Sequence, residues 1–359
     1  MKSPRISVVV DSYNQERFIE QAVVSVLEQD LSPEDFEIIA IDDGSTDRTP
    51  EILKKFESRV RCYRKQNGGQ ASALNAAIPR TSAEFVAFLD GDDWWEKTKL
   101  STILDAFAKH PGVAAVGHGF YEVYGSAPPT QMFLSDKTCL LDLSSKEAAR
   151  IASLGRTLLG TSRLTVKRTV LDRIGPIPSE LVFCADTPIL TLSLALGGAV
   201  IIDKPLCNYR HHGENLFSQD SLEPAKLRRK ADILEFLLGY LGRRLSELNV
   251  PSDIVGELFD ADEVELSRLR LQLGDRSRWR TLQTEMRDLR TTYQNPSLAY
   301  LFFKSLVAVT SVVLSPARFY RLRSWYGAKD LARIRGLFAE ANPTVSPSIF
   351  QHRPVVKSE

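Results

Sequence analysis

Cysteine is scarce in this chain of 359 residues, and no two cysteines have Cys-x-x-Cys spacing. The four cysteines lie far apart, at Cys62, Cys139, Cys184 and Cys207. Scattered thiols supply neither the paired ligands of a zinc site nor the dense spacing of a small disulfide-bonded domain. Their pattern therefore indicates a protein of a reducing compartment.

A large excess of charge is also missing. The 46 lysines and arginines balance 45 aspartates and glutamates, which leaves a net charge of +1. This balance gives no overall attraction to nucleic acid or to a membrane, so any such attraction would have to come from a local patch. We expect no nucleic-acid partner.

Two phosphate-binding motifs and a leading apolar segment are absent as well. No Gly-x-Gly-x-x-Gly follows the first expected strand, and no Gly-x-x-x-x-Gly-Lys-Ser/Thr occurs anywhere. The common dinucleotide and P-loop modes are therefore disfavoured. Residues 1–5 run directly into an expected strand, which leaves no room for the apolar part of a signal peptide. We expect a cytoplasmic protein, working free or at the inner face of the cell membrane.

The first part of the chain alternates short apolar runs with amphipathic stretches. The expected strands are 6–10, 36–41, 60–63, 85–89 and 113–116, with helices between them. Further strands are expected over 161–166 and 200–202, and an irregular variable loop over 121–138. Strand–helix alternation with short connections predicts an α/β domain with a parallel sheet and helices on both faces.

Polar residues and a glycine collect directly after four of these strands. They are Tyr13, Asn14, Asp42, Asp43, Asn67, Gly69, Asp90 and Asp92. Because the carboxyl ends of parallel strands share one edge of the sheet, these residues predict a single ligand crevice.

The acidic turn after the fourth run, Asp90-Gly91-Asp92-Asp93, has two interpretations by itself. Carboxylates two and three residues apart suit a divalent cation that carries phosphates. A solvated turn, with Asp92 or Asp93 capping the next helix, explains the same residues without a ligand.

Four motifs together resemble those of family 2 glycosyltransferases with the GT-A fold. They are Val-Val-Val-Asp-Ser-Tyr-Asn (8–14), Asp-Asp-Gly-Ser-Thr-Asp (42–47), Asn-Gly-Gly-Gln-Ala-Ser-Ala-Leu-Asn (67–75) and Phe-Leu-Asp-Gly-Asp-Asp (88–93). Their order and spacing match over roughly residues 5–215. The resemblance implies a Rossmann-like mixed sheet that binds a nucleotide-sugar, expected to be a UDP-sugar, together with Mg²⁺ or Mn²⁺.

The resemblance also implies roles for single residues. Tyr13 would lie against the base, Asp42 or Asp43 would bond its edge, and Asp92 would be the principal metal ligand. The other candidates for metal binding are Asp90 and His212. The full set of candidates for substrate binding is Tyr13, Asn14, Asp42, Asp43, Asn67, Gly69, Asn75, Asp90 and Arg210.

A catalytic base is expected at the start of the helix that follows Phe183. Many relatives carry Glu-Asp there, and the aspartate deprotonates the acceptor hydroxyl. This chain has Ala185-Asp186, so the aspartate is kept and the glutamate is absent. Asp186 is therefore the expected base, whereas any acceptor contact of the glutamate is in doubt; as an alternative, Asp186 simply caps the helix.

Tyr209-Arg210-His211-His212-Gly213 resembles the segment that ends this catalytic domain. The matching histidine is His212, which would complete the metal sphere or touch the diphosphate, while Arg210 would offset phosphate charge. A surface loop on the way to the next helix is the other interpretation.

The second half changes character. Leucines and an alanine recur with 4-3 spacing over 227–248, which predicts an amphipathic helix that packs on the catalytic domain, pairs in a hairpin, or forms a homodimer. The stretch 298–314 is apolar but short for a membrane span and contains Lys304. Because basic and aromatic residues follow it, peripheral membrane contact through 298–335 is one use of this segment, and packing on the domain is the other. We expect three parts: a catalytic domain at 1–219, an α-helical region at 220–341 and a loose tail at 342–359.

These observations predict an inverting glycosyltransferase that moves a sugar from a nucleotide-sugar to a hydroxyl of a glycan or lipid-linked acceptor, in cell-envelope polysaccharide synthesis. Two other classes stay open. A sugar-phosphate nucleotidyltransferase should have a glycine-rich basic loop after the first strand, which residues 11–14 do not provide. A catalytically inactive binding or scaffold protein would be free to lose the carboxylates that this chain keeps.

Overall fold

The computed structural model describes residues 3–125, 128–129, 131–212, 223–274, 277–292, 308–327 and 350–355. The chain divides into two compact units. Unit 1 comprises Met1–Phe217, Leu241–Ile254 and Ile349–Glu359, and unit 2 comprises Ser218–Tyr240 and Val255–Ser348. The expected boundary near residue 219 differs from this division because two later segments group with unit 1.

Four parallel strands form the first part of the sheet in unit 1. They are β1 (Ile6–Ser12), β2 (Phe36–Asp42), β3 (Arg61–Arg64) and β4 (Phe85–Asp90), in the spatial order β3-β2-β1-β4. Val8, Val9 and Val10 of β1 are fully buried, so side chains on both faces of this strand lie in the core. An apolar, β-branched run is what a strand covered on both faces requires.

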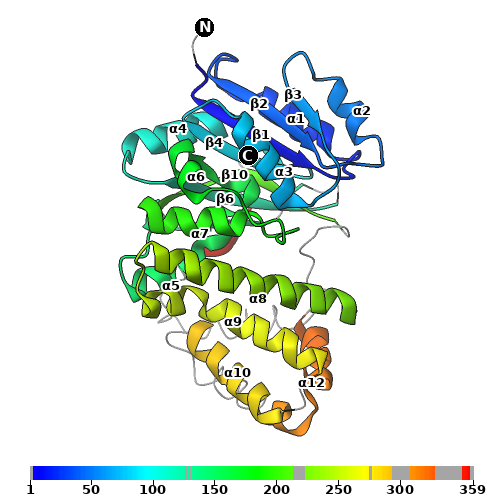
Figure 1. Cartoon of the computed structure of the whole chain (residues 1–359), viewed down its shortest axis with the longest axis vertical. Coiled ribbons are helices and arrows are strands. Elements are labelled where there is room, and N and C mark those ends of the chain that lie inside the picture. The colour runs from blue at the N-terminus through cyan, green and yellow to red at the C-terminus, as the bar shows by residue number, and fades with distance from the viewer. Residues whose placement is uncertain are drawn as a thin grey trace. The chain divides into compact units, whose positions relative to one another are not determined.

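Helices connect and cover these strands (Figure 1). They are α1 (Ile19–Leu27), α2 (Thr49–Lys54), α3 (Gln70–Ala77) and α4 (Lys99–Lys109), with a short 3-10 turn at Ile78–Arg80. The predicted alternation of strand and helix is confirmed over this part of the chain.

The second part of the sheet is mixed. β6 (Ala115–Tyr124) pairs in parallel with β10 (Ala199–His211), while β9 (Thr165–Lys167) is antiparallel to both β4 and β6. Shorter antiparallel strands complete it: β5 (Trp94–Trp95) and β8 (Cys139–Leu141) pair with β10, and β7 (Gln131–Ser135) pairs with β6. The remaining helices of this region are α5 (Lys146–Gly155), α6 (Arg168–Ile174) and α7 (Asp186–Gly197).

Two local predictions are corrected. The segment 161–166 is not one strand, because Thr161–Arg163 forms a 3-10 turn before β9 begins at Thr165. The expected loop at 121–138 contains the end of β6 and all of β7. β7 is only five residues long and lies between β6 and β11 (Phe350–Pro354) in the sheet, so its pairing depends on a strand more than 200 residues later in the chain.

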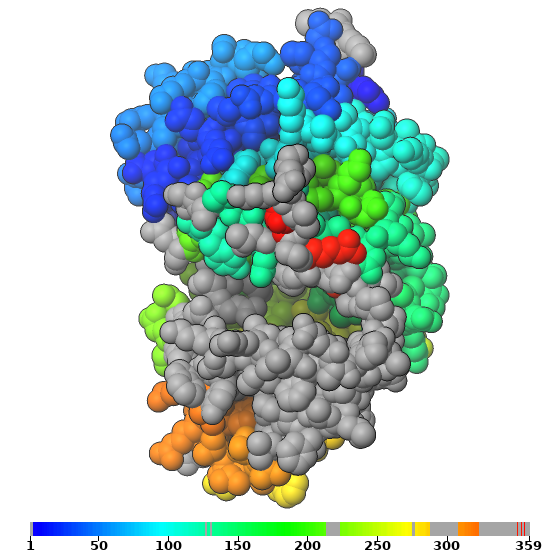
Figure 2. All heavy atoms as spheres, turned by 180° about the vertical axis from the view of Figure 1, so that it is seen from behind, coloured from blue at the N-terminus to red at the C-terminus, as the bar shows by residue number. Residues whose placement is uncertain are grey.

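The chain's last described residues lie in a strand, although we expected residues 342–359 as a loose tail. β11 (Phe350–Pro354) pairs antiparallel with β7, from Phe350 opposite Ser135 to Pro354 opposite Gln131. In Figure 2 the red atoms of this segment lie beside turquoise and green atoms of unit 1. The Phe350 side chain is 5% exposed, so this strand contributes to the core.

Unit 2 is helical over its described residues. Its elements come from α8 (Pro224–Glu247), α9 (Ser252–Leu273), α10 (Arg278–Thr292) and α12 (Pro316–Gly327). Ion pairs join α8 to α9, including Lys230 to Glu265 at 3.1 Å. Glu285 of α10 is 4% exposed and accepts hydrogen bonds from Arg268 Nε and Tyr320 Oη, both at 3.2 Å. A buried carboxylate is therefore paired with a cation and a hydroxyl, as burial of a charge requires.

Within the described residues, no helix is both long enough and apolar enough to cross a bilayer. Most of the apolar stretch 298–314 lies outside the described residues, which include only 308–314 of it.

Candidate functional site

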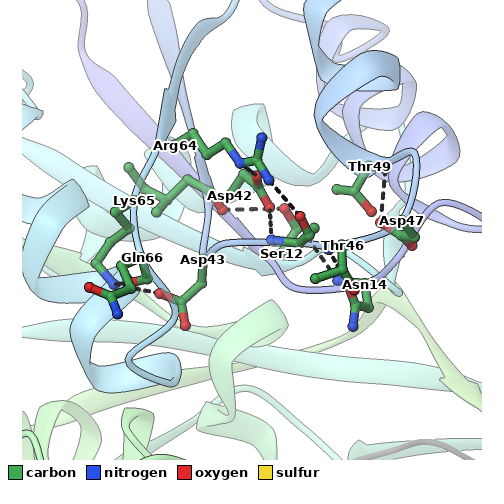
Figure 3. Close-up of polar contacts among 12 residues, drawn as sticks. Ser12, Asn14, Asp42, Asp43, Thr46, Asp47, Thr49, Arg64, Lys65 and Gln66 are labelled. Atoms are coloured by element: carbon green, nitrogen blue, oxygen red, sulfur yellow. Dashed lines mark hydrogen bonds and ion pairs between the residues drawn. The ribbon is translucent and has the colours of Figure 1, made fainter.

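The last residue of β2 and the first residue after it are two buried aspartates at the carboxyl edge of the sheet (Figure 3). Asp42 accepts a hydrogen bond from Ser45 N and forms an ion pair with Arg64 Nε at 3.1 Å. Asp43 forms an ion pair with Lys65 Nζ at 2.5 Å and accepts from Gly69 N at 2.7 Å. Each carboxylate thus has a cationic partner. Asp43 also joins the loop after β2, the second loop, to the loop after β3, the third loop.

The loops after β1 and β3 lie next to this pair. Asn14 adopts a left-handed conformation with φ +53°, and its Oδ1 accepts from Thr46 N at 2.8 Å, which joins the first loop to the second. Tyr13 beside it is 47% exposed, so its ring is available to a ligand. Asn67 is exposed, and a Cβ on Gly44 would lie 2.6 Å from its backbone nitrogen. The structure therefore brings these sequence-predicted residues together.

The acidic turn after β4 is held in place by Gln70, which is half-buried, and by the buried Ser162. Asp90 Oδ1 accepts from Gln70 Nε2 at 3.0 Å, and Asp90 Oδ2 accepts from Ser162 Oγ at 3.2 Å. Burial raises the pKa of Asp90 well above its usual range, and the charges of Asp11 and Asp92 add to this. Burial also raises the pKa of Asp93 to about 7.

Asp11 is a further carboxylate of this group that our sequence reasoning did not select. It lies on β1 directly opposite Asp90 of β4. Its pKa is raised to about 8, first by burial and then by Asp92, and its buried Oδ1 has no hydrogen-bond partner among the described residues. The available signal in the sequence was its place directly after the first apolar run, residues 6–10. Asp11 therefore belongs to the same group of carboxylates as Asp90 and Asp92.

Two residues from the end of β10 and the segment after it approach this turn. His212 Nε2 lies 2.9 Å from Asp92 Oδ2, and both side chains are 16% exposed. Arg210 donates from its backbone nitrogen to Asp93 Oδ1 and from Nε to the Asp92 carbonyl oxygen, each at 2.9 Å. The structure thus places both predicted residues against the acidic turn.

Asp186 begins α7, and its carboxylate is oriented by one main-chain donor. Thr161 N donates to Asp186 Oδ2 at 3.0 Å. The charge of Asp186 contributes to the raised pKa of both Asp11 and Asp90, which places it close to the acidic group. A carboxylate oriented in this way beside the acidic group is suited to accept a proton.

Asn75 does not join this group through any described contact. Its Nδ2 donates to the Ile177 carbonyl oxygen at 2.7 Å, and its Oδ1 accepts from Ile177 N at 2.9 Å. The side-chain amide therefore ties α3 to the segment before α7. A role for Asn75 near the ribose and phosphates stays a prediction.

Comparison with known proteins supplies the family. The model of glycosyl transferase family 2 matches residues 7–154. An uncharacterized glycosyltransferase of Nostoc sp. is 31% identical over 226 residues, which cover 59% of this chain and 66% of that protein. This chain belongs to glycosyl transferase family 2.

Solved structures show the same fold. TarS of Staphylococcus aureus in complex with UDP-GlcNAc matches with a TM-score of 0.54 and 19% identity, over 80% of this chain and 89% of that one. A mannosyltransferase of Pyrobaculum calidifontis in complex with GDP-Man and Mn²⁺ matches with a TM-score of 0.53 and 19% identity, over 91% and 85%. The GT-A fold predicted from the motifs is confirmed. Across three curated relatives, the aligned part spans 35% to 66% of the relative's own length.

Besides Asp11, sequence reasoning missed two residues at this family 2 site. Gln70 and Ser162 both contact Asp90, yet neither is a charged residue at the end of a strand. Ser162 also accepts hydrogen bonds at its carbonyl oxygen from Trp95 Nε1 and the buried Lys99 Nζ. The only available signal was the place of Gln70 within the Asn-Gly-Gly-Gln motif; nothing in the sequence indicated Ser162.

Proposed function

We propose that this chain is an inverting glycosyltransferase that transfers a sugar from a nucleotide-sugar to a hydroxyl group. The observation that carries the proposal is the meeting of the Asp92–His212 pair with Asp186 beside one group of carboxylates. A diphosphate site and a base next to each other are the two parts that such a transfer needs. Membership of family 2 and the GT-A fold support the assignment.

Donor binding would use the edge formed by the first three loops. The exposed ring of Tyr13 offers a stacking surface for a base. Asp42 and Asp43 already hold Arg64 and Lys65, but a carboxylate has about four acceptor positions and can accept a further N–H from the base. A UDP-sugar is the donor we propose.

A divalent cation fits the acidic turn. Among the described residues, no three histidine, cysteine or acidic side chains form a group that could hold a metal ion. Mg²⁺ commonly takes only one or two carboxylates and completes its shell with phosphate oxygens and water. Asp92 and His212 would hold Mg²⁺ or Mn²⁺ in this way, with Asp90 as a further candidate. Burial, and after it the charge of Asp92, raises the pKa values of Asp11 and Asp93, and a bound cation would stabilise the ionised form of these carboxylates. When bound, the cation supplies Lewis-acid stabilisation of the leaving diphosphate.

In the reaction that we propose, Asp186 takes the proton of the acceptor hydroxyl while Thr161 N holds its other oxygen. The acceptor oxygen forms a bond with the anomeric carbon from the face opposite the nucleotide. The bond from that carbon to the diphosphate oxygen breaks, and its electron pair leaves with the nucleotide. The anomeric configuration inverts because attack and departure occur on opposite faces. Arg210, which contacts the acidic turn, offers positive charge near the leaving group.

We propose a glycan or lipid-linked acceptor of the cell envelope, because relatives include a putative teichuronic acid biosynthesis glycosyltransferase of Bacillus subtilis. We also propose that the protein works at the inner face of the membrane and that it forms a homodimer through the α8 region.

A panel of nucleotide-sugars tests this function. Purified protein is incubated with UDP-, GDP-, dTDP-, ADP- and CMP-sugars, with Mg²⁺ or Mn²⁺ and candidate acceptors, and nucleotide release is measured. We expect release from one donor class that depends on the metal and on Asp186. Folded protein that releases no nucleotide from any donor, with or without acceptors, would favour a binding or scaffold role instead.

A further inference from the structure

Gln70, the first residue of α3, lies where the third loop meets the segment before α7. Its backbone nitrogen donates to the Val182 carbonyl oxygen at 3.2 Å. Gly69 before it has φ +81°, and a Cβ there would lie 2.8 Å from Val182 Cα. Only glycine permits both this left-handed conformation and this close approach. The start of α3 is therefore packed directly against the 182–185 segment.

The side-chain amide of Gln70 has three partners from three separate segments. Nε2 donates to Asp90 Oδ1 at the end of β4, at 3.0 Å, and to Thr161 Oγ1 at 3.2 Å. Oε1 accepts from Ala185 N at 3.2 Å. Because a backbone N–H must donate, the oxygen of the amide has to face Ala185, which leaves both N–H groups for the other two partners. The hydrogen-bonding capacity of the amide nitrogen is fully used.

Two of these partners hold Asp186. Ala185 precedes it in the chain, and Thr161 N donates to its Oδ2 at 3.0 Å. Cys184, two residues before Asp186, has φ +58° without being a glycine. Such a conformation costs energy and persists only where the surroundings hold it. The hydrogen bond from Ala185 N to Gln70 Oε1 is a contact that can hold Cys184 in this conformation.

We propose that Gln70 is a positioning residue that fixes the carboxylate of Asp186 relative to Asp90. This inference rests on the proposed function, in which Asp186 is the base and Asp90 lies on the donor side. Only an amide of this length donates to Asp90 and accepts from Ala185 N at once. Leucine can do neither, and asparagine is one methylene too short to reach all three partners.

The first measurement is a kinetic comparison of wild type with Gln70→Leu, using the donor found with the panel. A control is Gln66→Leu, which changes an exposed glutamine on the same loop. We expect Gln70→Leu to lower kcat by about 10- to 100-fold, since small misplacements of catalytic groups have effects of this size. The Kd for the nucleotide product should change less than about threefold, because Asp90 on the donor side keeps its hydrogen bond from Ser162 Oγ. The control should match wild type in both. A kcat within twofold of wild type, or a loss confined to the nucleotide Kd, would overturn the proposal.

A second measurement needs no donor. The protein carries Cys62→Ser and Cys139→Ser and is treated with a water-soluble thiol reagent. The rate of labelling then reports on Cys184, since Cys207 is buried. We expect Gln70→Leu to raise the labelling rate of Cys184 by about tenfold, because the 182–185 segment opens more readily without its amide contact. An unchanged rate contradicts the proposed hold on this segment. If Gln70→Leu does not fold, Gln70→Asn decides both measurements with the same expected directions.

The two proposals fail in different ways. Wild-type protein that transfers no sugar from any donor refutes the proposed function, and with it the role of Gln70 in catalysis. Active wild type with an equally active Gln70→Leu refutes only the positioning role.

Discussion

Asp186 is the residue on which the proposed chemistry depends most directly. Its Oδ2 accepts from Thr161 N at 3.0 Å, so the direction of the carboxylate is set by the main chain. Asparagine has the same shape and can accept the same hydrogen bond, but it cannot take up a proton at neutral pH. The substitution therefore separates the placement of this group from its basicity.

We expect Asp186→Asn to keep nucleotide binding and to lose transfer by about 10²- to 10⁴-fold, the range for removal of a general base. Steady-state kinetics and calorimetric titration of the nucleotide product measure the two properties. Asp105→Asn, at an exposed position of α4, is the matched control and should leave both unchanged. Turnover of Asp186→Asn at the wild-type rate would eliminate this residue as the base.

The raised pKa of Asp11 predicts that the stability of the metal-free protein depends on pH. Its folded-state pKa of about 8 lies above the ordinary value, so the folded protein holds a proton that the unfolded chain releases near pH 4. The stability that this proton contributes is full below about pH 4 and is lost as pH rises towards 8. We therefore expect the melting temperature of metal-free protein to fall between pH 5 and pH 8.

In Asp11→Asn this fall should be smaller, because the variant has no carboxylate to ionise at that position. Thermal unfolding followed by circular dichroism in chelator-treated buffer gives the comparison. Equal slopes for wild type and variant would contradict the raised pKa of Asp11.

Among the strands and helices, those that a local pattern of residues defines were predicted best from the sequence. β1, β2 and β4 are short apolar runs followed by polar residues, and α3 follows a glycine with a left-handed backbone. These local signals gave the positions of the strands, and therefore the carboxyl edge of the sheet, where most candidate residues lie. Membership of family 2 could be predicted because the carboxyl ends of the first four strands are followed, in order, by four motifs of that family.

Elements that depend on distant partners were not predictable in this way. Residues 161–163 form a 3-10 turn rather than a strand, since Ser162 bonds Asp90, Trp95 and Lys99. Gln70 reaches residues 20, 91 and 115 positions away in the chain, which no local pattern records. The strands β7, β8 and β11 are short and partly exposed, so their pairing is defined only by the assembled sheet.

β11 leads to a stability prediction for the end of the chain. Phe350 is 5% exposed, and its ring lies against Gly155, where an added Cβ would be 2.8 Å from Phe350 Cζ. We expect Phe350→Ala to lower the free energy of unfolding by about 3 kcal/mol, as for other buried phenylalanines. Urea denaturation measures this change. Leu140→Ala, at a position 55% exposed on β8, should cost less than about 0.5 kcal/mol. A Phe350→Ala variant as stable as wild type would show that β11 does not belong to the core.

A helical segment of unit 2 exposes apolar side chains on one face. Val309 and Val313, four residues apart in a helical stretch, are 60% and 64% exposed, and Arg318 on α12 is also exposed. If this segment contacts anionic lipid, Val309→Glu with Val313→Glu should lower binding to phosphatidylglycerol vesicles by about tenfold, given the apolar burial lost. Vesicle flotation measures the bound fraction. Leu154→Glu, an exposed apolar position in unit 1, is the control, and equal flotation of all variants would remove the proposed membrane contact.

At the scale of the whole molecule, the candidate chemistry lies in unit 1. The carboxylates, His212, Arg210 and Asp186 all belong to it. Among the described residues of unit 2 we find helices joined by ion pairs and the small apolar cluster of Leu271, Phe319 and Tyr320, but no arrangement suited to catalysis. The family model likewise ends at residue 154, so the sequence relationship is carried by unit 1. The contact of unit 2 with a membrane or with a second copy stays a proposal.

In the function that we propose, the carboxyl edge of this sheet binds a nucleoside diphosphate together with a divalent cation through Asp92. Calorimetric titration of UDP and GDP, with and without Mn²⁺, tests it most directly in wild type and Asp92→Asn. We predict binding of one nucleotide that requires Mn²⁺ and weakens by about 10- to 100-fold in Asp92→Asn, the usual effect of disturbing a metal site. Binding that is equally strong without metal and in Asp92→Asn, or no binding of either nucleotide to folded wild type, would contradict it.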